Sequence, residues 1–231
     1  MRQPVKGRSE AGRRRESRAH ETRERIAGEG LRLFLEKGYV GTTVQAIAEA
    51  AHVAPATVYQ AFGTKHAVLA AALDIMVVGD DASPSVLDQD WVDEVRRETN
   101  PGRQLRLVAE GTSRIAARTA PIKEVMRDAA ATESAARELI REDHEGRYRT
   151  QAALVDLLIE NRPLRAGMDR RRAVDTYFAI VNSTTYELLV VQRGWTLSEW
   201  QAWIADVIER TLFAEGAVSD GDGTSVHKAL P

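Results

Sequence analysis

The segment from residue 54 to residue 62 combines residue types and spacing that suit the reading of nucleic-acid bases. Val58 and Phe62 recur one helical turn apart and predict the inner face of a short helix. The opposite face carries small or uncharged side chains: Ala56, Thr57, Gln60 and Ala61, with Tyr59 at its flank. In the major groove of DNA, glutamine amides pair with adenine and threonine methyls contact thymine. A helical hairpin inside a bundle would show the same spacing, so this pattern alone leaves both interpretations open.

Two further short helices are predicted before this segment. The first has its inner face at Ile26, Gly30, Leu33 and Phe34 and ends near Gly38. In the second, Thr42 and Thr43 offer hydroxyl caps and the inner face is Val44, Ile47, Ala48 and Ala51. Pro55 then stands in the first turn of the next helix, where its missing N–H costs nothing. Two short helices joined by a turn of three or four residues indicate a helix-turn-helix.

The sequence from Thr22 to Leu69 resembles the N-terminal domain of TetR-family transcriptional regulators. The resemblance rests on Thr22-Arg23, Ile26, Leu33-Phe34, Gly38-Tyr39, Thr42-Thr43-Val44, Ile47-Ala48, Ala51, Val53, Ala56-Thr57-Val58-Tyr59, Phe62 and Lys65. It covers about a fifth of the chain, and the later helices are similar to the family only in number and length.

The resemblance implies a DNA-contacting surface made of Thr42, Thr43, Gln45, Pro55, Ala56, Thr57, Tyr59, Gln60 and Lys65. In that surface Thr42 and Thr43 hold a backbone phosphate, in agreement with the attraction of anions to a helix N-terminus. Gln45 reaches a base edge or a phosphate, and Tyr59 and Lys65 contact phosphates. The base-facing residues are Ala56, Thr57 and Gln60, with Ala61 close behind.

Four positions depart from the family pattern. His52 stands at the turn position that is usually glycine, and histidine is one of the residues that tolerate a left-handed backbone. Ala54 replaces the usual Ser or Thr cap. Gly28 and Gly30 stand where alanine is common, at a cost of up to about 1 kcal/mol each in helix propensity.

The charge of the chain is distributed unevenly. Residues 1–67 contain 12 Lys and Arg against 7 Asp and Glu, whereas residues 68–231 contain 20 against 27. The helix at residues 54–62 has no cation, so attraction to DNA is expected from Arg23, Arg25, Lys65, helix dipoles and the basic residues 13–18. We expect residues 1–20 to be an unstructured tail, which either enters a minor groove or only aids solubility.

The whole chain is predicted to be all-α, with about nine helices. Residues 21–80 form the three-helix helix-turn-helix DNA-binding domain, residues 81–216 form a larger helical ligand-binding and dimerisation domain, and residues 217–231 are an unstructured tail. Breaks are expected at residues 79–84, 100–102, 121, 161–167 and 194–196. The longest helices are predicted at residues 133–160, 169–193 and 198–213.

The resemblance implies that the last two of these helices form a homodimer interface and that the domain encloses a small-molecule effector. Candidate ligand contacts are the polar or aromatic side chains on the mostly apolar middle helices: Thr112, Arg114, Met126, Tyr148, Tyr177, Asn182 and Thr185. Each of them could equally be a core residue or a surface residue. A dimer would read a near-palindromic operator in double-stranded DNA.

Composition argues against other functional classes. The 231 residues include no cysteine, which excludes disulfides and thiolate zinc sites, and no apolar run reaches the ~18 residues of a membrane span. The five histidines are scattered, and no metal, cofactor or phosphate-loop motif occurs. We therefore expect a cytoplasmic regulator, most simply a repressor released by its effector, rather than an enzyme. The alternative is a helical ligand-binding protein with weak or no specific DNA binding.

Overall fold

The computed structural model describes residues 10–79 and 85–214, and these residues form two compact units. The first unit contains Met1–Pro84 and Ala117–Gly146, and the second contains Ser85–Ala116 and Arg147–Pro231. The predicted domain of residues 81–216 differs from the second unit, because residues 117–146 pack with the DNA-binding helices. Apart from the single turn α9, the described residues form nine α-helices and no strand, which confirms the all-α prediction.

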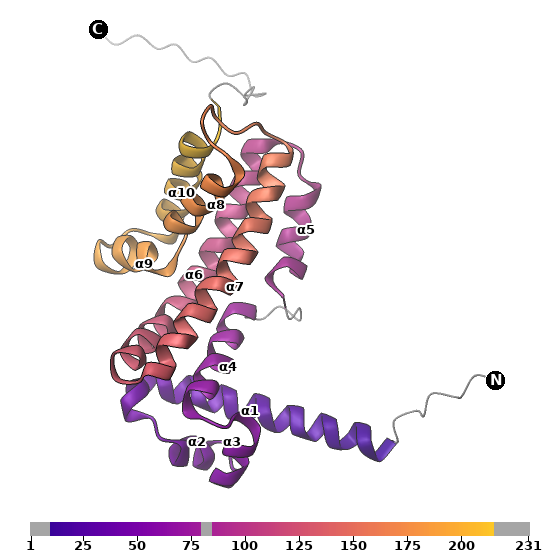
Figure 1. Cartoon of the computed structure of the whole chain (residues 1–231), viewed down its shortest axis with the longest axis vertical. Coiled ribbons are helices and arrows are strands. Elements are labelled where there is room, and N and C mark those ends of the chain that lie inside the picture. Colours follow the sequence, from indigo (N-terminus) through magenta and orange to yellow (C-terminus); the bar gives the residue numbers. More distant parts are fainter. Residues whose placement is uncertain (1–9, 80–84, 215–231) are drawn as a thin grey trace, which may run out of the picture. The chain divides into compact units, whose positions relative to one another are not determined.

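Four helices of the first unit come from the N-terminal part of the chain: α1 (Glu10–Gly41), α2 (Val44–Ala50), α3 (Pro55–Phe62) and α4 (Lys65–Val78) (Figure 1). Side-chain caps determine where two of these helices begin. The Thr43 hydroxyl accepts a hydrogen bond from the Ala46 N–H and caps α2, and Thr64 caps α4 in the same way. Ala54 gives α3 no side-chain cap, as expected from the sequence.

The core of the first unit contains the inner faces predicted from the sequence. The cluster contains Ile26, Phe34, Ile47 and Val58 from these inner faces. It also includes Val68 and Leu69 of α4, Ile122, Val125 and Ala129 of α6, and Ala136 and Leu139 of α7. His52 has a φ of 52°, so the predicted left-handed turn residue is confirmed.

The prediction of an unstructured tail is wrong for residues 10–20, which form the first turns of α1. Ser17 donates a hydrogen bond to Glu21 (3.0 Å), and Nε2 of His20 lies 3.1 Å from Oε1 of Glu24. Pairs at this spacing stabilise an exposed helix. Residues 1–9 and the predicted tail at 217–231 lie outside the described residues.

The second unit is built on a separate core. It contains the 3₁₀ turn η1 (Val86–Asp88), α5 (Asp90–Arg97), α8 (Arg170–Ile180), α9 (Ser183–Tyr186), the π-helix η2 (Glu187–Gln192) and α10 (Leu197–Leu212). The long helices α6 (Pro101–Thr132) and α7 (Ser134–Glu160) contribute residues to both units. The largest buried side chains of the second core include Tyr177 and Trp200.

Two predictions about helix breaks are wrong. Pro121 lies inside α6. Proline cannot donate a backbone hydrogen bond, but the residues around it favour the helix strongly enough for α6 to continue. Residues 169–193 are not one helix, because α8 ends at Ile180, with Val181 as its C-cap. There the Asn182 side chain accepts from the N–H groups of Thr184 and Thr185 and starts α9.

Among the described residues, no single helix is long and apolar enough to span a membrane. By length and composition alone, α3 and α4 pass such a test together, as a pair bent by 70°.

The two glycines of α1 that replace the common alanines have different surroundings. A Cβ atom at Gly28 would have no neighbour within 4 Å, whereas a Cβ atom at Gly30 would lie 2.6 Å from Cγ1 of Val68 on α4. Gly30 therefore permits the close approach of α1 and α4, and Gly28 has no such role.

We expect opposite effects when each glycine is replaced by alanine. Gly28→Ala should raise the free energy of unfolding by up to about 1 kcal/mol, through helix propensity alone. Gly30→Ala should lower it by about 1–3 kcal/mol, because overpacking forces Val68 or α4 to move. Urea unfolding followed by circular dichroism measures both. A stabilised Gly30→Ala protein would contradict the assignment.

Candidate nucleic-acid interface

The outer face of α3 is open to solvent and uncharged. Ala56, Tyr59 and Gln60 are exposed, Pro55 and Thr57 are partly exposed, and the inner residues Val58 and Phe62 are buried. Tyr59 is 55% exposed and is therefore not a half-buried core aromatic. This face can approach a groove of DNA closely and present hydrogen-bonding groups to base edges.

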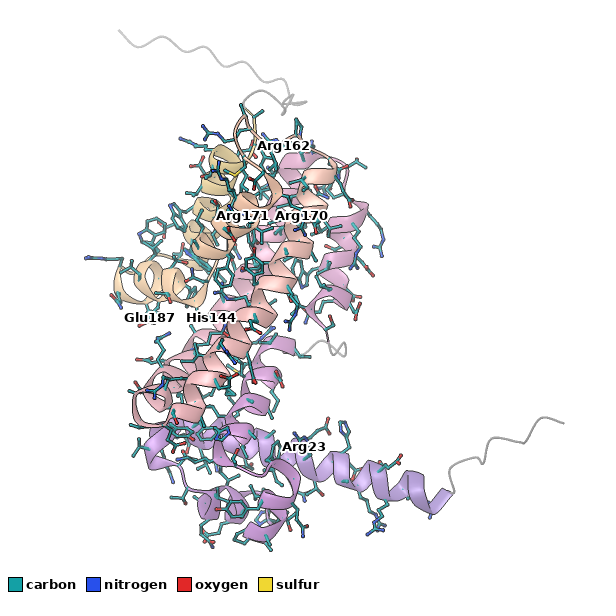
Figure 2. The ribbon with its side chains drawn as sticks, viewed as in Figure 1. Arg23, His144, Arg162, Arg170, Arg171 and Glu187 are labelled. Atoms are coloured by element: carbon teal, nitrogen blue, oxygen red, sulfur yellow. The ribbon has the colours of Figure 1, made fainter. Side chains whose placement is uncertain are left out.

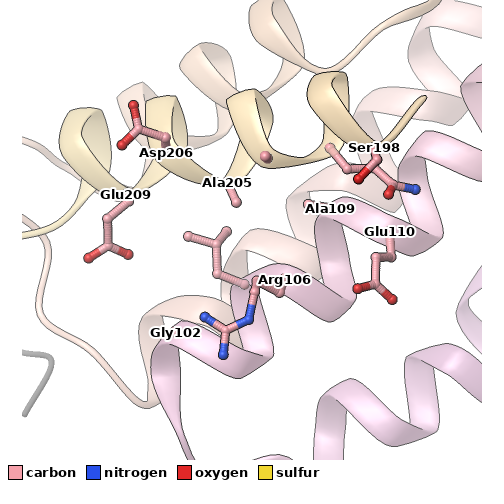
Figure 3. A pocket seen from close by; sticks show the side chains of 11 residues that line it. Gly102, Arg106, Ala109, Glu110, Ser198, Ala205, Asp206 and Glu209 are labelled. Atoms are coloured by element: carbon pink, nitrogen blue, oxygen red, sulfur yellow. The ribbon is translucent and has the colours of Figure 1, made fainter. Parts of the chain in front are cut away.

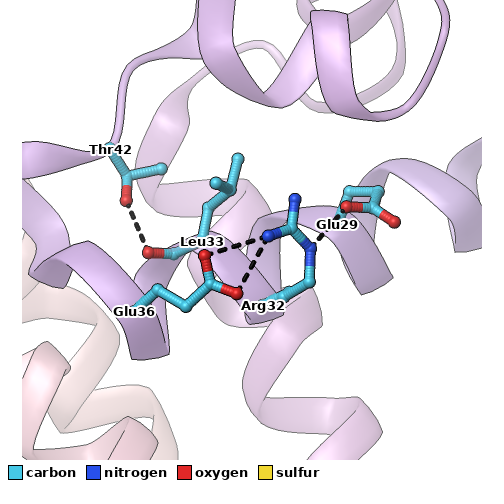
Figure 4. Close-up of polar contacts among 5 residues, drawn as sticks. All are labelled: Glu29, Arg32, Leu33, Glu36 and Thr42. Atoms are coloured by element: carbon cyan, nitrogen blue, oxygen red, sulfur yellow. Dashed lines mark hydrogen bonds and ion pairs between the residues drawn. The ribbon is translucent and has the colours of Figure 1, made fainter.

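The two threonines before α2 have different roles. Oγ1 of Thr43 accepts from the Ala46 N–H, so the exposed Thr43 hydroxyl keeps its proton to donate. Thr42 is fully buried, and its hydroxyl donates to the carbonyl oxygen of Leu33 at 3.0 Å (Figure 4) and to that of Gly38 at 2.8 Å. The predicted phosphate contact of Thr42 is therefore wrong, because its hydroxyl closes the end of α1. Gln45 is exposed and donates to Glu49.

Three cations expected to attract DNA are bonded to backbone carbonyls instead. Nε of Arg25 donates to the Ala51 carbonyl (2.9 Å) at the end of α2. Arg23, labelled in Figure 2, donates to the Ala61 carbonyl near the end of α3, and its guanidinium lies 4.0 Å from the centre of the Phe62 ring. Nζ of Lys65 donates to the Tyr39 carbonyl (3.0 Å) near the end of α1.

A fourth cation acts in the same way at the end of α4. Arg118 of α6 donates to the Met76 carbonyl and, at 2.7 Å, to the Val77 carbonyl. Carbonyl groups at a helix C-terminus have no partner within the helix and carry the negative end of its dipole, so cations stabilise them. These arginines and this lysine therefore hold the four helices in their mutual positions.

Tyr39 links the helix-turn-helix to the turn between α6 and α7. Its hydroxyl donates to Oε2 of Glu133 (2.7 Å), and its ring lies 3.9 Å from the Lys65 ammonium. Burial and the bond to Glu133 raise the pKa of Tyr39, so the phenol stays protonated. Burial lowers the pKa of Lys65, and the nearby Glu133 partly opposes that shift.

The predicted ligand contacts do not form one site. Thr112 and Tyr177 meet in the core of the second unit, where the two hydroxyl oxygens are 3.4 Å apart. Tyr148 lies against Phe178 and donates to Asp175 (2.9 Å) on the surface. The side chains of Asn182 and Thr185 bond backbone groups at the break between α8 and α9.

Two of the predicted ligand contacts are wrong for a pocket in the second unit. Met126 is buried in the core of the first unit. Arg114 is exposed, because its position on α6 points it away from the apolar stripe.

A groove of about 450 Å³ lies between α6 and α10 of the second unit, and none of the predicted ligand residues lines it (Figure 3). Its floor is made by small residues, among them Gly102, Ala109 and Ala205, and charged side chains such as Arg106 and Glu209 stand at its edges. The only sequence signal for it was the small residues at helical spacing, which also occur in ordinary helix packing.

Comparisons with known proteins agree with this geometry. Residues 26–72 match the family model described as "Bacterial regulatory proteins, tetR family". No curated protein matches the sequence.

Solved structures share the fold. FadR from Bacillus subtilis, in complex with stearoyl-CoA, aligns with a TM-score of 0.61 and 18% identity over 80% of this chain and 96% of its own. NalD, the secondary repressor of the MexAB-OprM multidrug efflux pump in Pseudomonas aeruginosa, has a TM-score of 0.58 and 21% identity, with 85% and 98% covered. A putative TetR-family transcriptional regulator from Rhodococcus sp. has a TM-score of 0.61 and 16% identity, with 84% and 99% covered.

The helix-turn-helix matches the family model in sequence, its open face suits DNA, and the fold of the chain is that of TetR-family regulators. Residues 26–72 therefore form a DNA-binding domain of the TetR family, and the protein is a DNA-binding transcriptional regulator.

Proposed function

We propose that this regulator is a repressor that binds a near-palindromic operator as a homodimer and leaves it when a small-molecule effector binds. The observation that carries the proposal is the exposed, uncharged face of α3, held in place by cations that bond the ends of α1 to α4. The proposal places the protein in the cytoplasm, where bacterial DNA lies, and assigns it no catalytic role.

Reading contacts and positioning contacts fall on different residues. Ala56, Thr57 and Gln60, with Pro55 beside them, face the bases in this proposal. Thr43 and Tyr59 donate hydroxyl protons to phosphates, and Gln45 lies close enough to the start of α2 to assist. Lys65 uses one of its three N–H donors on Tyr39 and keeps the others for a phosphate.

Dimerisation is proposed through the last helical segments of the second unit. Leu188 of η2 is 46% exposed and Val191 is 64% exposed, and both are large apolar side chains. On α10, Trp203 is partly exposed and packs edge-on against Trp195. Apolar surface of this kind is typical of an interface between subunits.

The second unit is the proposed effector-binding unit. Oε1 of Gln104, Oγ of Ser113 and Nε1 of Trp200 are buried there without hydrogen-bond partners in the described part of the chain. Buried polar atoms normally have partners, so a ligand or ordered water would satisfy them. The complex of Bacillus subtilis FadR with stearoyl-CoA supports a small-molecule effector for this fold.

Gln60→Ala and Lys65→Ala should have different effects on DNA binding. Gln60→Ala should relax the preference at one base pair per half-site, a discrimination of about 1–3 kcal/mol, with the salt dependence nearly unchanged. Lys65→Ala should weaken specific and scrambled DNA alike and reduce the salt slope by about 1 per subunit. It should also destabilise the fold, because the Tyr39 carbonyl loses the Lys65 hydrogen bond and the Tyr39 ring loses the contact with the ammonium.

Selection from a random duplex library gives the site preference of each variant, and a salt titration gives the slope. A preference that changes with Lys65→Ala but not with Gln60→Ala would contradict the assignment. If the unmodified protein selects no sequence at all, it is a ligand-binding protein rather than an operator-binding one.

Sedimentation equilibrium should give twice the chain mass of 25.5 kDa at micromolar concentration. Leu188→Asp with Val191→Asp should shift the protein toward the monomer, because charges would replace apolar contacts at the interface. Val40→Asp is the matched control, since Val40 is a 72% exposed apolar residue on α1. A monomeric unmodified protein would contradict the proposal.

A thermal-shift screen of metabolites that includes stearoyl-CoA tests the effector. A compound present at a hundred times its Kd should stabilise the protein by about 2.7 kcal/mol. The same compound should release labelled operator DNA in a fluorescence anisotropy assay, because it binds the two states with different affinities. A screen in which compounds stabilise the protein without changing its affinity for DNA would contradict effector control.

A further inference from the structure

The N-terminal part of α1 forms a regular helix from Glu10 onward. The side chains of residues 14–21 are exposed, and the first buried residue of α1 is Ile26. Figure 1 shows this part of α1 projecting away from α2, α3 and α4, with its N-terminal end at the level of α2 and α3 in that view. An exposed helical extension has little tertiary packing to stabilise it, so a binding partner would add to its stability.

The arginines of this projecting part share one side of the helix. At 100° per residue, Arg14, Arg15 and Arg18 lie within an arc of about 100°. Arg25 lies in the same arc, and its guanidinium bonds the Ala51 carbonyl at the end of α2. The side of α1 that carries these arginines is therefore the side on which α2 lies. Glu21, which accepts from Ser17, lies at the edge of the arc, and Glu16 lies on the opposite side.

We propose that residues 10–22 form a DNA-binding arm that lies along the sugar-phosphate backbone next to each half-site, with Arg14, Arg15 and Arg18 facing phosphates. The inference rests on the proposed operator binding and extends the DNA surface beyond the helix-turn-helix. Thirteen helical residues span about 20 Å, which corresponds to about six base pairs of flanking DNA.

The distribution of cations favours DNA as the partner of the arm. Neither α2 nor α3 contains an Arg or Lys, and Arg23, Arg25 and Lys65 each bond a backbone carbonyl. Protein–DNA affinity depends strongly on phosphate neutralisation, so the first unit needs cations outside the helix-turn-helix. The arm supplies three exposed ones, which add affinity without reading sequence.

Binding to two duplexes tests the arm. An operator is first selected from a random library with the full chain. One duplex ends at the outer edges of the half-sites, and the other carries about eight further base pairs on each side. The unmodified protein should bind the longer duplex at least tenfold more tightly, and Arg14→Ala/Arg15→Ala/Arg18→Ala should lose that gain. Alanine is the best helix former, so the helix itself is kept.

The triple variant should also reduce the salt slope by about 2–3 per subunit and leave base preferences unchanged. Arg97→Ala/Arg103→Ala/Arg149→Ala is the control, because it removes the same charge from exposed arginines of the second unit. If flanking DNA adds no affinity, or if the control loses as much of the gain as the arm variant, the arm proposal is wrong. Tight, selective binding to the short duplex would still support the proposed function, whereas the absence of any selected sequence would overturn both.

Discussion

Cations bonded to the carbonyl groups at helix C-termini are the interaction on which this structure depends. Within the first unit, Lys65, Arg25, Arg23 and Arg118 bond the ends of α1, α2, α3 and α4. Arg147 repeats the arrangement in the second unit, donating to the carbonyls of Phe178 and Val181 (3.2 Å each) where α8 breaks. Each bond places a cation at the negative end of a helix dipole and fixes one helix to another element.

The same bonds shape the DNA-binding surface. They use the guanidinium groups of Arg23 and Arg25, which could otherwise face phosphates, and α3 itself has an uncharged outer face of small and hydrogen-bonding side chains. In the proposed DNA complex this face contacts bases and adds little electrostatic attraction, so the affinity would come from cations elsewhere on the first unit. The projecting part of α1 adds three exposed arginines, Arg14, Arg15 and Arg18.

The two long helices α6 and α7 give a physical connection between effector and DNA. Both contribute to the cores of both units. In the first unit, Arg118 of α6 bonds the end of α4, and Glu133, between α6 and α7, bonds Tyr39 next to the helix-turn-helix. A movement of α6 or α7 in the second unit can therefore be transmitted along the same helix to Arg118 and Glu133, which bond α4 and Tyr39 of α1.

The sequence by itself determined α2, α3 and the exposed face of α3, because apolar periodicity and helix caps act over only a few residues. It could not determine that Thr42 is buried, that Lys65 bonds Tyr39, or that Met126 belongs to the first core. These depend on which distant segments meet, which local patterns do not encode. The predicted ligand residues lie in different places for the same reason. A polar side chain on an apolar helix has the same sequence pattern whether it contacts a ligand, a backbone carbonyl or water.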